Sequence, residues 1–389
     1  MMKIKKVVLI VVDALGIGAL PDANKYGDVG ANTFVHVYEK CKPDLPNLTD
    51  LGLLAAAGIE TEDEPLGCYG RLREAAAGKD TTTGHWELAG LTLKKPFPTY
   101  PNGFPKAVIE AIEAEIGMGL IGNVAASGTE IIERLGEEHL RTGKPIAYTS
   151  ADSVFQIAAH EAIIPATELW HICRLARRVL MGENAVGRVI ARPFVGNPGA
   201  FERTGNRKDF SLDPTGKTLL DVVKDAGLDV VGIGKIEDIF NHHGLTGSNH
   251  AVGNAACVDA LLEALKKPKF SGLIFANLVD TDMLYGHRND PEGYAAALEA
   301  FDKRLPEIMR TLGGEGLLIV TGDHGCDPTF PGTDHTREYV PALVWSLAAN
   351  ENVNLGTRKT FADVSATILD ALGLKNTLDG ASFWPEVKL

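Results

Sequence analysis

The chain has 389 residues, enough for two or three domains, and its 45% hydrophobic content supports a large core and argues against disorder. Its formal net charge of −13 excludes broad binding to nucleic acid or to anionic membranes, which requires a basic surface. A phosphorylated substrate remains compatible with this charge, because a few cations or bound metal ions reverse the sign locally.

The first predicted element is a strand over residues 7–12, an apolar run that follows several lysines and ends at Asp13. A secretory signal peptide has a longer, uncharged apolar region, so we interpret the run as a buried parallel strand. The rest of the sequence contains no stretch of membrane-spanning length. Five widely spaced cysteines without a CxxC motif favour a reducing, cytoplasmic compartment.

The middle of the chain has a different pattern. It opens with the proline-rich stretch KKPFPTYPNGFP and closes with RPFVGNPGAFERTGNRKDFSLDPTG. Between them we predict a helix, a strand, a helix, two short strands, a helix and a strand. This pattern indicates a smaller α+β cap domain over 96–213, inserted into a core domain formed by 1–95 and 214–389. The prolines and glycines at both borders suggest hinges.

Apolar, β-branched runs return after this insertion, at 227–234, 271–280, 315–323 and 341–347. Amphipathic helical patterns separate them, such as TLLDVVKDAG and EGYAAALEAFDKRLPEIMRTLG. Strands that alternate with helices and are apolar throughout are typical of an α/β domain. We therefore expect a mostly parallel sheet with helices on both faces.

Acidic and histidine residues follow the ends of three of these predicted strands. In open parallel sheets, ligands bind outside the carboxyl ends of the strands. A single aspartate there is usually a helix N-cap, and a single histidine is usually an ordinary polar residue. Three such strand ends at one rim favour a metal site instead. The candidate ligands are Asp13, Asp282, His287, Asp323, His324 and His335.

Six ligands are too many for one catalytic ion that must keep an open position. Two ions about 3.5–4 Å apart suit an in-line phosphoryl displacement. Carboxylates mixed with imidazoles suit manganese, zinc or magnesium.

The stretch KDTTTGHWE offers a nucleophile, since a threonine hydroxyl beside two cations can lose its proton. We expect it to follow a helical segment, REAAAGKD, and to lead through a glycine turn into a helix N-terminus that binds phosphate. Spacing does not choose among Thr81, Thr82 and Thr83, and a capping loop is the alternative. His85 either supports the metal ligands or packs against Trp86; we favour packing.

Five motifs together resemble the alkaline phosphatase superfamily, and more closely the bacterial phosphopentomutase family, over nearly the whole chain: VVDALGIGALPDA, DTTTGHWE, DTDMLYGHRNDPEGY, TGDHGCDPT and PGTDHTREYVP. The resemblance implies that Thr83 is the phosphorylated nucleophile. It implies two manganese ions, with other divalent ions possible. One ion would be bound by Asp13, Asp323 and His324, and the other by Asp282, His287 and His335.

The resemblance also implies contacts to the pentose and its distal phosphate. They would come from Ser150, Asp152, Arg188, Arg207 and Lys235. Bidentate arginines suit phosphate, but each of these residues could instead be a solvated charge or part of a surface pair.

The implied activity interconverts α-D-ribose 1-phosphate and D-ribose 5-phosphate, and the 2-deoxyribose pair, through a phosphothreonine and a sugar bisphosphate. A primer such as glucose 1,6-bisphosphate would start the cycle, and the cap domain would position the sugar and exclude water. The implied partners are small sugar phosphates, without nucleic acid or membrane. The alternatives are a metal-dependent phosphatase or sulfatase, a cofactor-independent phosphoglycerate mutase, and a non-catalytic metal-binding module.

Overall fold

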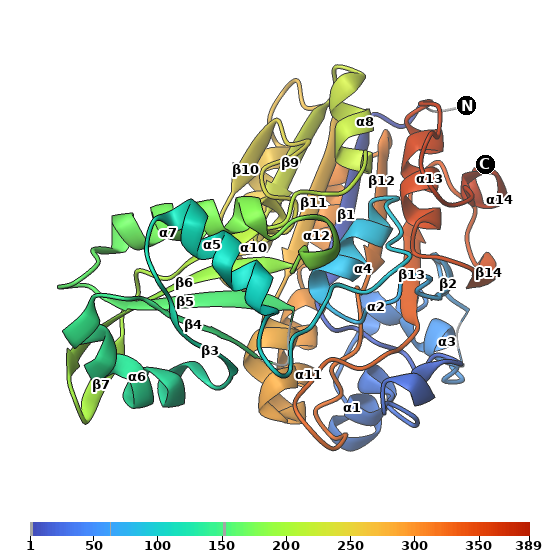
Figure 1. Cartoon of the computed structure of the whole chain (residues 1–389). Coiled ribbons are helices and arrows are strands. Elements are labelled where there is room, and N and C mark those ends of the chain that lie inside the picture. Colours follow the sequence, from blue (N-terminus) through green and yellow to red (C-terminus); the bar gives the residue numbers. More distant parts are fainter. Residues whose placement is uncertain (1–2, 63, 151–152) are drawn as a thin grey trace. The chain divides into compact units, whose positions relative to one another are not determined.

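The computed structural model describes residues 3–62, 64–150 and 153–389. The chain forms two compact units (Figure 1): unit 1 comprises residues 1–95 and 214–389, and unit 2 comprises residues 96–213. The roles that the sequence suggests for them, catalytic core and cap, stay predictions.

Unit 1 is built on an eight-stranded sheet with the order β10-β9-β11-β1-β12-β13-β2-β14. The strands from β10 to β12 are parallel, β13 is antiparallel to both of its neighbours, and β14 is parallel to β2. The expected mostly parallel sheet is therefore present, with one reversed strand. The strands are β1 (Lys6–Val12), β2 (Cys68–Leu72), β9 (Asp229–Ile233), β10 (Gly247–Asn249), β11 (Gly272–Leu278), β12 (Gly316–Thr321), β13 (Val340–Trp345) and β14 (Asn354–Arg358).

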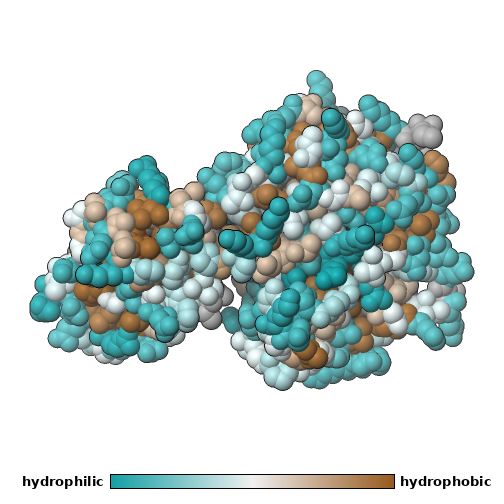
Figure 2. All heavy atoms as spheres, turned by 45° about the vertical axis from the view of Figure 1, so that its right-hand side comes forward, coloured by the Kyte–Doolittle hydropathy of each residue, from teal (hydrophilic) through white to brown (hydrophobic). Residues whose placement is uncertain are grey.

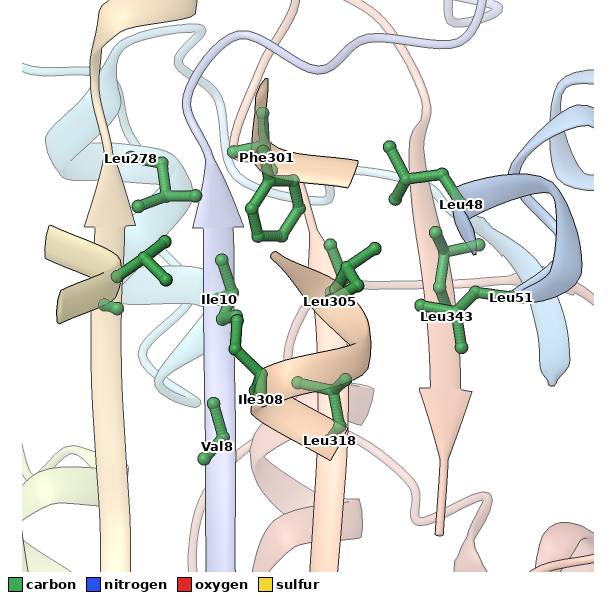
Figure 3. Close-up of a cluster of buried hydrophobic side chains, with 14 of the residues drawn as sticks. Val8, Ile10, Leu48, Leu51, Leu278, Phe301, Leu305, Ile308, Leu318 and Leu343 are labelled. Carbon is green, nitrogen blue, oxygen red and sulfur yellow. The ribbon is translucent and has the colours of Figure 1, made fainter. Parts of the chain in front are cut away.

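Helices cover both faces of this sheet (Figure 1). Alternate residues of β1, such as Val8 and Ile10, face a layer that contributes Leu48, Leu305 and other apolar side chains (Figure 3). Burying each such side chain contributes roughly 1.5–3 kcal/mol. This layer contains α1 (Thr33–Cys41), α2 (Pro46–Asp50), α3 (Leu53–Ala57), α10 (Asn254–Leu265), α11 (Pro291–Asp302) and α12 (Leu305–Leu312).

The second layer packs on the opposite sheet face, where Phe275 of β11 contacts the rings of His85 and Phe240. It contains α4 (Thr81–Leu88), α8 (Leu219–Asp225), α9 (Ile236–Ile239) and α13 (Asp363–Ala371), and α14 (Trp384–Val387) contacts α13. Two-sided coverage explains why the central strands are apolar throughout.

The register of the central strands sets the position of the functional residues. Val12 of β1 lies opposite Leu278 of β11, and Val11 lies opposite Thr321 of β12. The three strands therefore end at the same edge of the sheet, and the segments that follow them emerge side by side.

The predicted helical segment at 73–80 is wrong, because these residues form no helix. The carboxylate of Glu87 accepts hydrogen bonds from the amides of Ala75 (2.9 Å) and Ala76 (2.6 Å) and so fixes this segment outside a helix. Helix α4 begins at Thr81 and continues through the expected glycine turn. Asp80 caps it by accepting from the Thr83 amide at 3.1 Å.

Unit 2 contains a six-stranded mixed sheet of order β3-β4-β5-β6-β7, in which β8 also pairs with β6. Helices α5 and α7 pack on one face and α6 packs on the other. The predicted order of helices and strands is confirmed up to β6. The glycine-containing stretch that closes unit 2, which we expected only to mark the domain border, also forms β7 and β8. The elements are α5 (Lys106–Ile116), β3 (Ile121–Ala125), α6 (Gly128–Thr142), β4 (Ile146–Thr149), β5 (Val154–His160), α7 (Ala166–Val179), β6 (Arg188–Asn197), β7 (Ala200–Arg203) and β8 (Lys208–Ser211).

Hydrophilic residues predominate on the face drawn in Figure 2, and hydrophobic residues form small scattered groups there. Within the described ranges, every helix is too short or too polar to cross a membrane.

Candidate metal centre

The six predicted ligands come together where β1, β11 and β12 end. In the first group, Nε2 of His324 lies 3.4 Å from Oδ1 of Asp13 and 3.2 Å from Oδ2 of Asp323. All three residues are buried, and their ligand atoms lie within 4.8 Å of one another. This spacing suits three ligands of one ion.

The second group is formed by Asp282, His287 and His335. Oδ1 of Asp282 lies 3.3 Å from Nε2 of His335 and 3.4 Å from Nε2 of His287. The two imidazole nitrogens are 3.1 Å apart. The rings of His324 and His335 stack with their centroids 3.8 Å apart, so the two groups are adjacent.

The thiol of Cys326 also lies close to Asp282 and His287. Burial, reinforced by the charge of Asp282, raises the pKa of this thiol. Because metals bind the thiolate, this shift favours the role of a small buried residue, as we expected from the sequence.

The donor set fits a divalent cation. Among the described residues, Oδ1 of Asp13, Oδ1 of Asp282 and Oδ2 of Asp323 are buried without a hydrogen-bond partner. Burial raises the pKa of Asp13 well above its ordinary value, and the charges of Asp323 and Asp282 add to this effect. Buried carboxylates crowded in this way require a compensating positive charge. Two metal ions would provide that charge.

Thr81 is the threonine that contacts this centre. Its Oγ1 lies 3.1 Å from Nε2 of His324. By contrast, Thr83 is buried and its Oγ1 donates to Oδ2 of Asp80 at 2.5 Å. The geometry therefore does not support the expected nucleophile Thr83 and favours Thr81. The sequence contained a signal for this difference between the two threonines. An aspartate N-cap accepts a hydrogen bond from the backbone amide three positions further on, which is here that of Thr83.

Glycines allow helix α4 to approach the metal centre closely. A Cβ at Gly84 would overlap the backbone oxygen of Asp323, and a Cβ at Gly78 would lie 2.6 Å from Oγ1 of Thr83. The glycines of GKDTTTGH are therefore needed for close packing.

The remaining predicted contacts are distributed over both units. Lys235 follows β9 in unit 1, and its charge lowers the pKa of Asp13 against the larger effect of burial. Ser150 directly follows β4 in unit 2. Asp152 lies outside the described residues.

The other two predicted residues, Arg188 and Arg207, lie in unit 2 and share one carboxylate. Nε and Nη2 of Arg207 each donate to an oxygen of Asp209 at 2.7 Å. Nη1 of Arg188 lies 3.5 Å from the same side chain. Part of their positive charge is therefore neutralised within unit 2.

Further basic residues lie beside them. Burial raises the pKa of Tyr148, while Arg192, Arg203 and Arg207 oppose this shift. Burial, followed by the charge of Arg207, lowers the pKa of Arg192. Such crowded positive charge attracts an anion. Sequence reasoning missed Arg192 and Arg203, although Arg188 and Arg192 are an even number of positions apart on β6 and so share one face of the sheet.

Comparisons with known proteins identify the family of the chain. The family model of the Metalloenzyme superfamily matches residues 5–376. A phosphopentomutase of Caldanaerobacter subterraneus subsp. tengcongensis is 57% identical over 99% of each chain. A phosphopentomutase of Acetivibrio thermocellus is 57% identical over 97% of this chain and 98% of its own.

A solved protein structure from Pyrococcus horikoshii covers 98% of this chain and 100% of its own, with a TM-score of 0.52 and 16% identity, which supports the fold alone. The predicted alkaline-phosphatase-like α/β fold is confirmed. The chain belongs to the Metalloenzyme superfamily and, within it, to the phosphopentomutase family.

Proposed function

We propose that this enzyme interconverts α-D-ribose 1-phosphate and D-ribose 5-phosphate, and the corresponding 2-deoxyribose phosphates, by way of phosphorylated Thr81. Its family makes it an intramolecular phosphotransferase, an isomerase. The observation that carries the proposal is the 3.1 Å distance between Thr81 Oγ1 and His324 Nε2. It puts one hydroxyl beside a buried group of carboxylates and imidazoles.

Thr81 is suited to the nucleophilic role by its place in α4. It is the first residue of the helix, where backbone amides lack intrahelical acceptors and favour an anion. Asp80 and Thr83 bind each other through two hydrogen bonds, so the Thr83 hydroxyl is already engaged. Asp13, Asp323 and His324 would hold one Mn²⁺, and Asp282, His287 and His335 the other. These ions would supply positive charge to the transferring group.

The proposed cycle has two transfers. The bond between phosphorus and Oγ1 of Thr81 breaks as a bond forms between phosphorus and the free hydroxyl oxygen of the sugar monophosphate. That hydroxyl loses its proton, Oγ1 takes one up, and a sugar bisphosphate results. The second phosphoryl group of that bisphosphate then returns to Oγ1, and the isomeric monophosphate leaves. A bisphosphate such as glucose 1,6-bisphosphate would phosphorylate Thr81 initially.

The basic residues of unit 2 would bind the phosphate that does not react. Arg188 and Arg207 pair with Asp209, whose charge also reaches Arg192, while Arg203 acts on Arg192 and Tyr148. Four arginines against one aspartate leave positive charge in excess. Arginine binds phosphate through two parallel hydrogen bonds, which fixes orientation as well as charge. Ser150 and Lys235 remain candidates for contacts to the sugar phosphate.

The test is a coupled assay with ribose 1-phosphate, Mn²⁺ and glucose 1,6-bisphosphate. We expect ribose 5-phosphate to form without stoichiometric release of inorganic phosphate. Phosphate release without the isomer would indicate a phosphatase and contradict the mutase. Peptide mass spectrometry of enzyme treated with glucose 1,6-bisphosphate should locate the phosphoryl group on Thr81.

A further inference from the structure

We propose that His85 and Asn277 are a buried positioning pair: Asn277 holds the carboxylate of Asp13, and His85, bonded to Asn277, holds the start of helix α4 beside Asp323. Neither residue is among the six candidate ligands. The inference rests on the proposed function, in which those carboxylates bind a metal ion and Thr81 carries the phosphoryl group.

His85 connects the nucleophile to the first metal group. Its Nδ1 lies 2.9 Å from the backbone oxygen of Thr81 and 3.1 Å from Oδ2 of Asp323. The imidazole is fully buried and stacks on Phe275, with the ring centroids 5.7 Å apart. One ring nitrogen therefore faces both the residue with the reactive hydroxyl and a predicted ligand.

Asn277 connects the same imidazole to the other carboxylate. Its Nδ2 donates to Oδ2 of Asp13 at 2.9 Å and lies 3.3 Å from Nε2 of His85. A carboxylate only accepts hydrogen bonds, so the amide nitrogen must face Asp13. The amide then donates its second hydrogen to Nε2, which assigns the proton of His85 to Nδ1. That proton points to the Thr81 carbonyl.

A purely structural role is a poor explanation for this pair. Asn277 is the one polar side chain of strand β11, GLIFANL, and it is fully buried. Within the described chain its Oδ1 has no hydrogen-bond partner. An unsatisfied buried polar group costs about 1–3 kcal/mol, and an apolar residue would avoid this cost. The hydrogen bond from the Asn277 amide to Asp13 explains why a polar residue occupies this buried position despite that cost.

The expected effect is on metal affinity. Residues that orient metal ligands from outside the coordination sphere typically contribute 10–100-fold to affinity or activity. We therefore expect Asn277→Ala and His85→Leu to weaken Mn²⁺ binding by about 10–100-fold. His85→Asn keeps an amide donor near the position of Nδ1 and should recover part of this loss.

A matched control is available in unit 2. His139 is also fully buried and packs beside a phenylalanine, Phe194. Its Nδ1 lies 2.8 Å from the backbone oxygen of Lys144, and its Nε2 accepts from the amide of His160 at 2.9 Å. His139→Asn should therefore lower thermal stability without changing Mn²⁺ affinity.

The experiment titrates each full-length variant with Mn²⁺ by electron paramagnetic resonance and records its melting temperature and its kcat and KM. The proposal predicts weaker Mn²⁺ binding and lower kcat for Asn277→Ala and His85→Leu, with partial recovery in His85→Asn. Wild-type Mn²⁺ affinity in folded Asn277→Ala and His85→Asn would overturn it. If His85→Leu does not fold, the Mn²⁺ affinities of Asn277→Ala and His85→Asn decide whether the proposal holds. A wild-type protein that binds no Mn²⁺ would contradict the proposed function itself.

Discussion

The hydroxyl of Thr81 lies 3.1 Å from Nε2 of His324, although 243 positions separate the two residues in the sequence. Two positions after Thr81, the hydroxyl of Thr83 donates to Asp80, the residue that caps helix α4. The three consecutive threonines therefore include one hydroxyl at the metal centre and one that secures the helix cap.

Replacing Thr81 should abolish phosphoryl transfer. Thr81→Ala removes the proposed covalent nucleophile, so we expect kcat to fall by at least about 10³-fold, with Mn²⁺ still bound. The coupled mutase assay and Mn²⁺ titration measure the two effects separately.

Thr83→Ala is the matched variant. It should cost about 0.5–1.5 kcal/mol of stability through the lost hydrogen bond to Asp80 and lower kcat less than tenfold. An inactive Thr83→Ala beside an active Thr81→Ala would instead support Thr83 as the nucleophile.

Removing divalent cations should destabilise unit 1. Chelation leaves the buried carboxylates of Asp13, Asp282 and Asp323 without a cation, while their unpaired oxygens stay buried. Mn²⁺ at 100 times its dissociation constant should raise the free energy of unfolding by about 2.7 kcal/mol per site. Calorimetry with EDTA and with Mn²⁺ measures the difference. An unchanged melting temperature would argue against a metal ion at these residues.

Gly84→Ala should be destabilising although alanine is the better helix former. Helix propensity favours alanine over glycine by about 1 kcal/mol. The new Cβ would overlap the backbone oxygen of Asp323, however, and overpacking of this kind costs about 1–3 kcal/mol. Chemical denaturation should show a net loss, accompanied by weaker Mn²⁺ binding.

Gly247→Ala provides the comparison, since a Cβ there meets no atom within 4 Å. It should change stability little and leave Mn²⁺ affinity unaltered. If Gly84→Ala and Gly247→Ala change stability and Mn²⁺ affinity equally, the contact with Asp323 is not the cause of the loss in Gly84→Ala.

The buried pair of Arg337 and Glu74 should be strongly coupled. Nη1 of Arg337 lies 2.5 Å from Oε2 of Glu74, and the two side chains are only 3% and 1% exposed. Arg337→Met leaves a buried carboxylate unpaired, which should cost about 3–5 kcal/mol. The double variant with Glu74→Met should recover part of that loss in denaturant unfolding.

The loss in Arg337→Met should also depend on pH. Burial raises the pKa of Glu74 well above its ordinary value even with Arg337 opposing it. Removing Arg337 raises that pKa further. A carboxyl whose pKa is higher in the folded than in the unfolded state binds a proton more readily when the chain is folded. As pH rises the carboxyl loses that proton, and its buried negative charge then destabilises the folded state. Arg337→Met should therefore lose stability relative to wild type as pH rises above the ordinary pKa of a glutamate, about 4.3. A loss that is constant with pH would contradict this account.

Arg203→Met should weaken substrate binding if unit 2 binds the phosphate that does not react. A hydrogen bond to a charged group contributes about 1.5–3 kcal/mol, so KM for ribose 5-phosphate should rise about tenfold or more. Arg134→Met is the control, because Arg134 lies in an exposed pair 3.9 Å from Glu130 and should leave KM unchanged. If Arg203→Met has the same KM as the wild type, Arg203 does not bind the substrate phosphate.

Much of the architecture could be predicted from local sequence patterns. Apolar runs between amphipathic segments identified the central strands, because burial on both faces of a sheet leaves a continuous apolar sequence. The residues after those runs, Asp13, Asp282 and Asp323, could be expected at one rim because parallel strands end at the same edge. The structure brings them together with His287, His324 and His335.

Other features depend on contacts between distant residues, which local patterns do not encode. Residues 73–80 look helical, yet the carboxylate of Glu87 binds their backbone amides in another conformation. Strand β13 resembles its neighbours in composition, but only pairing with β12 and β2 determines that it runs antiparallel.

The sequence by itself determined the class of fold, the family motifs and the kinds of side chain available to bind metal. Only the tertiary structure distinguished Thr81 from Thr83 and related His85 to Asn277, 192 positions away. The physical reason is that a hydroxyl or an imidazole acquires its role from the atoms within hydrogen-bond distance, and here those atoms come from remote strands.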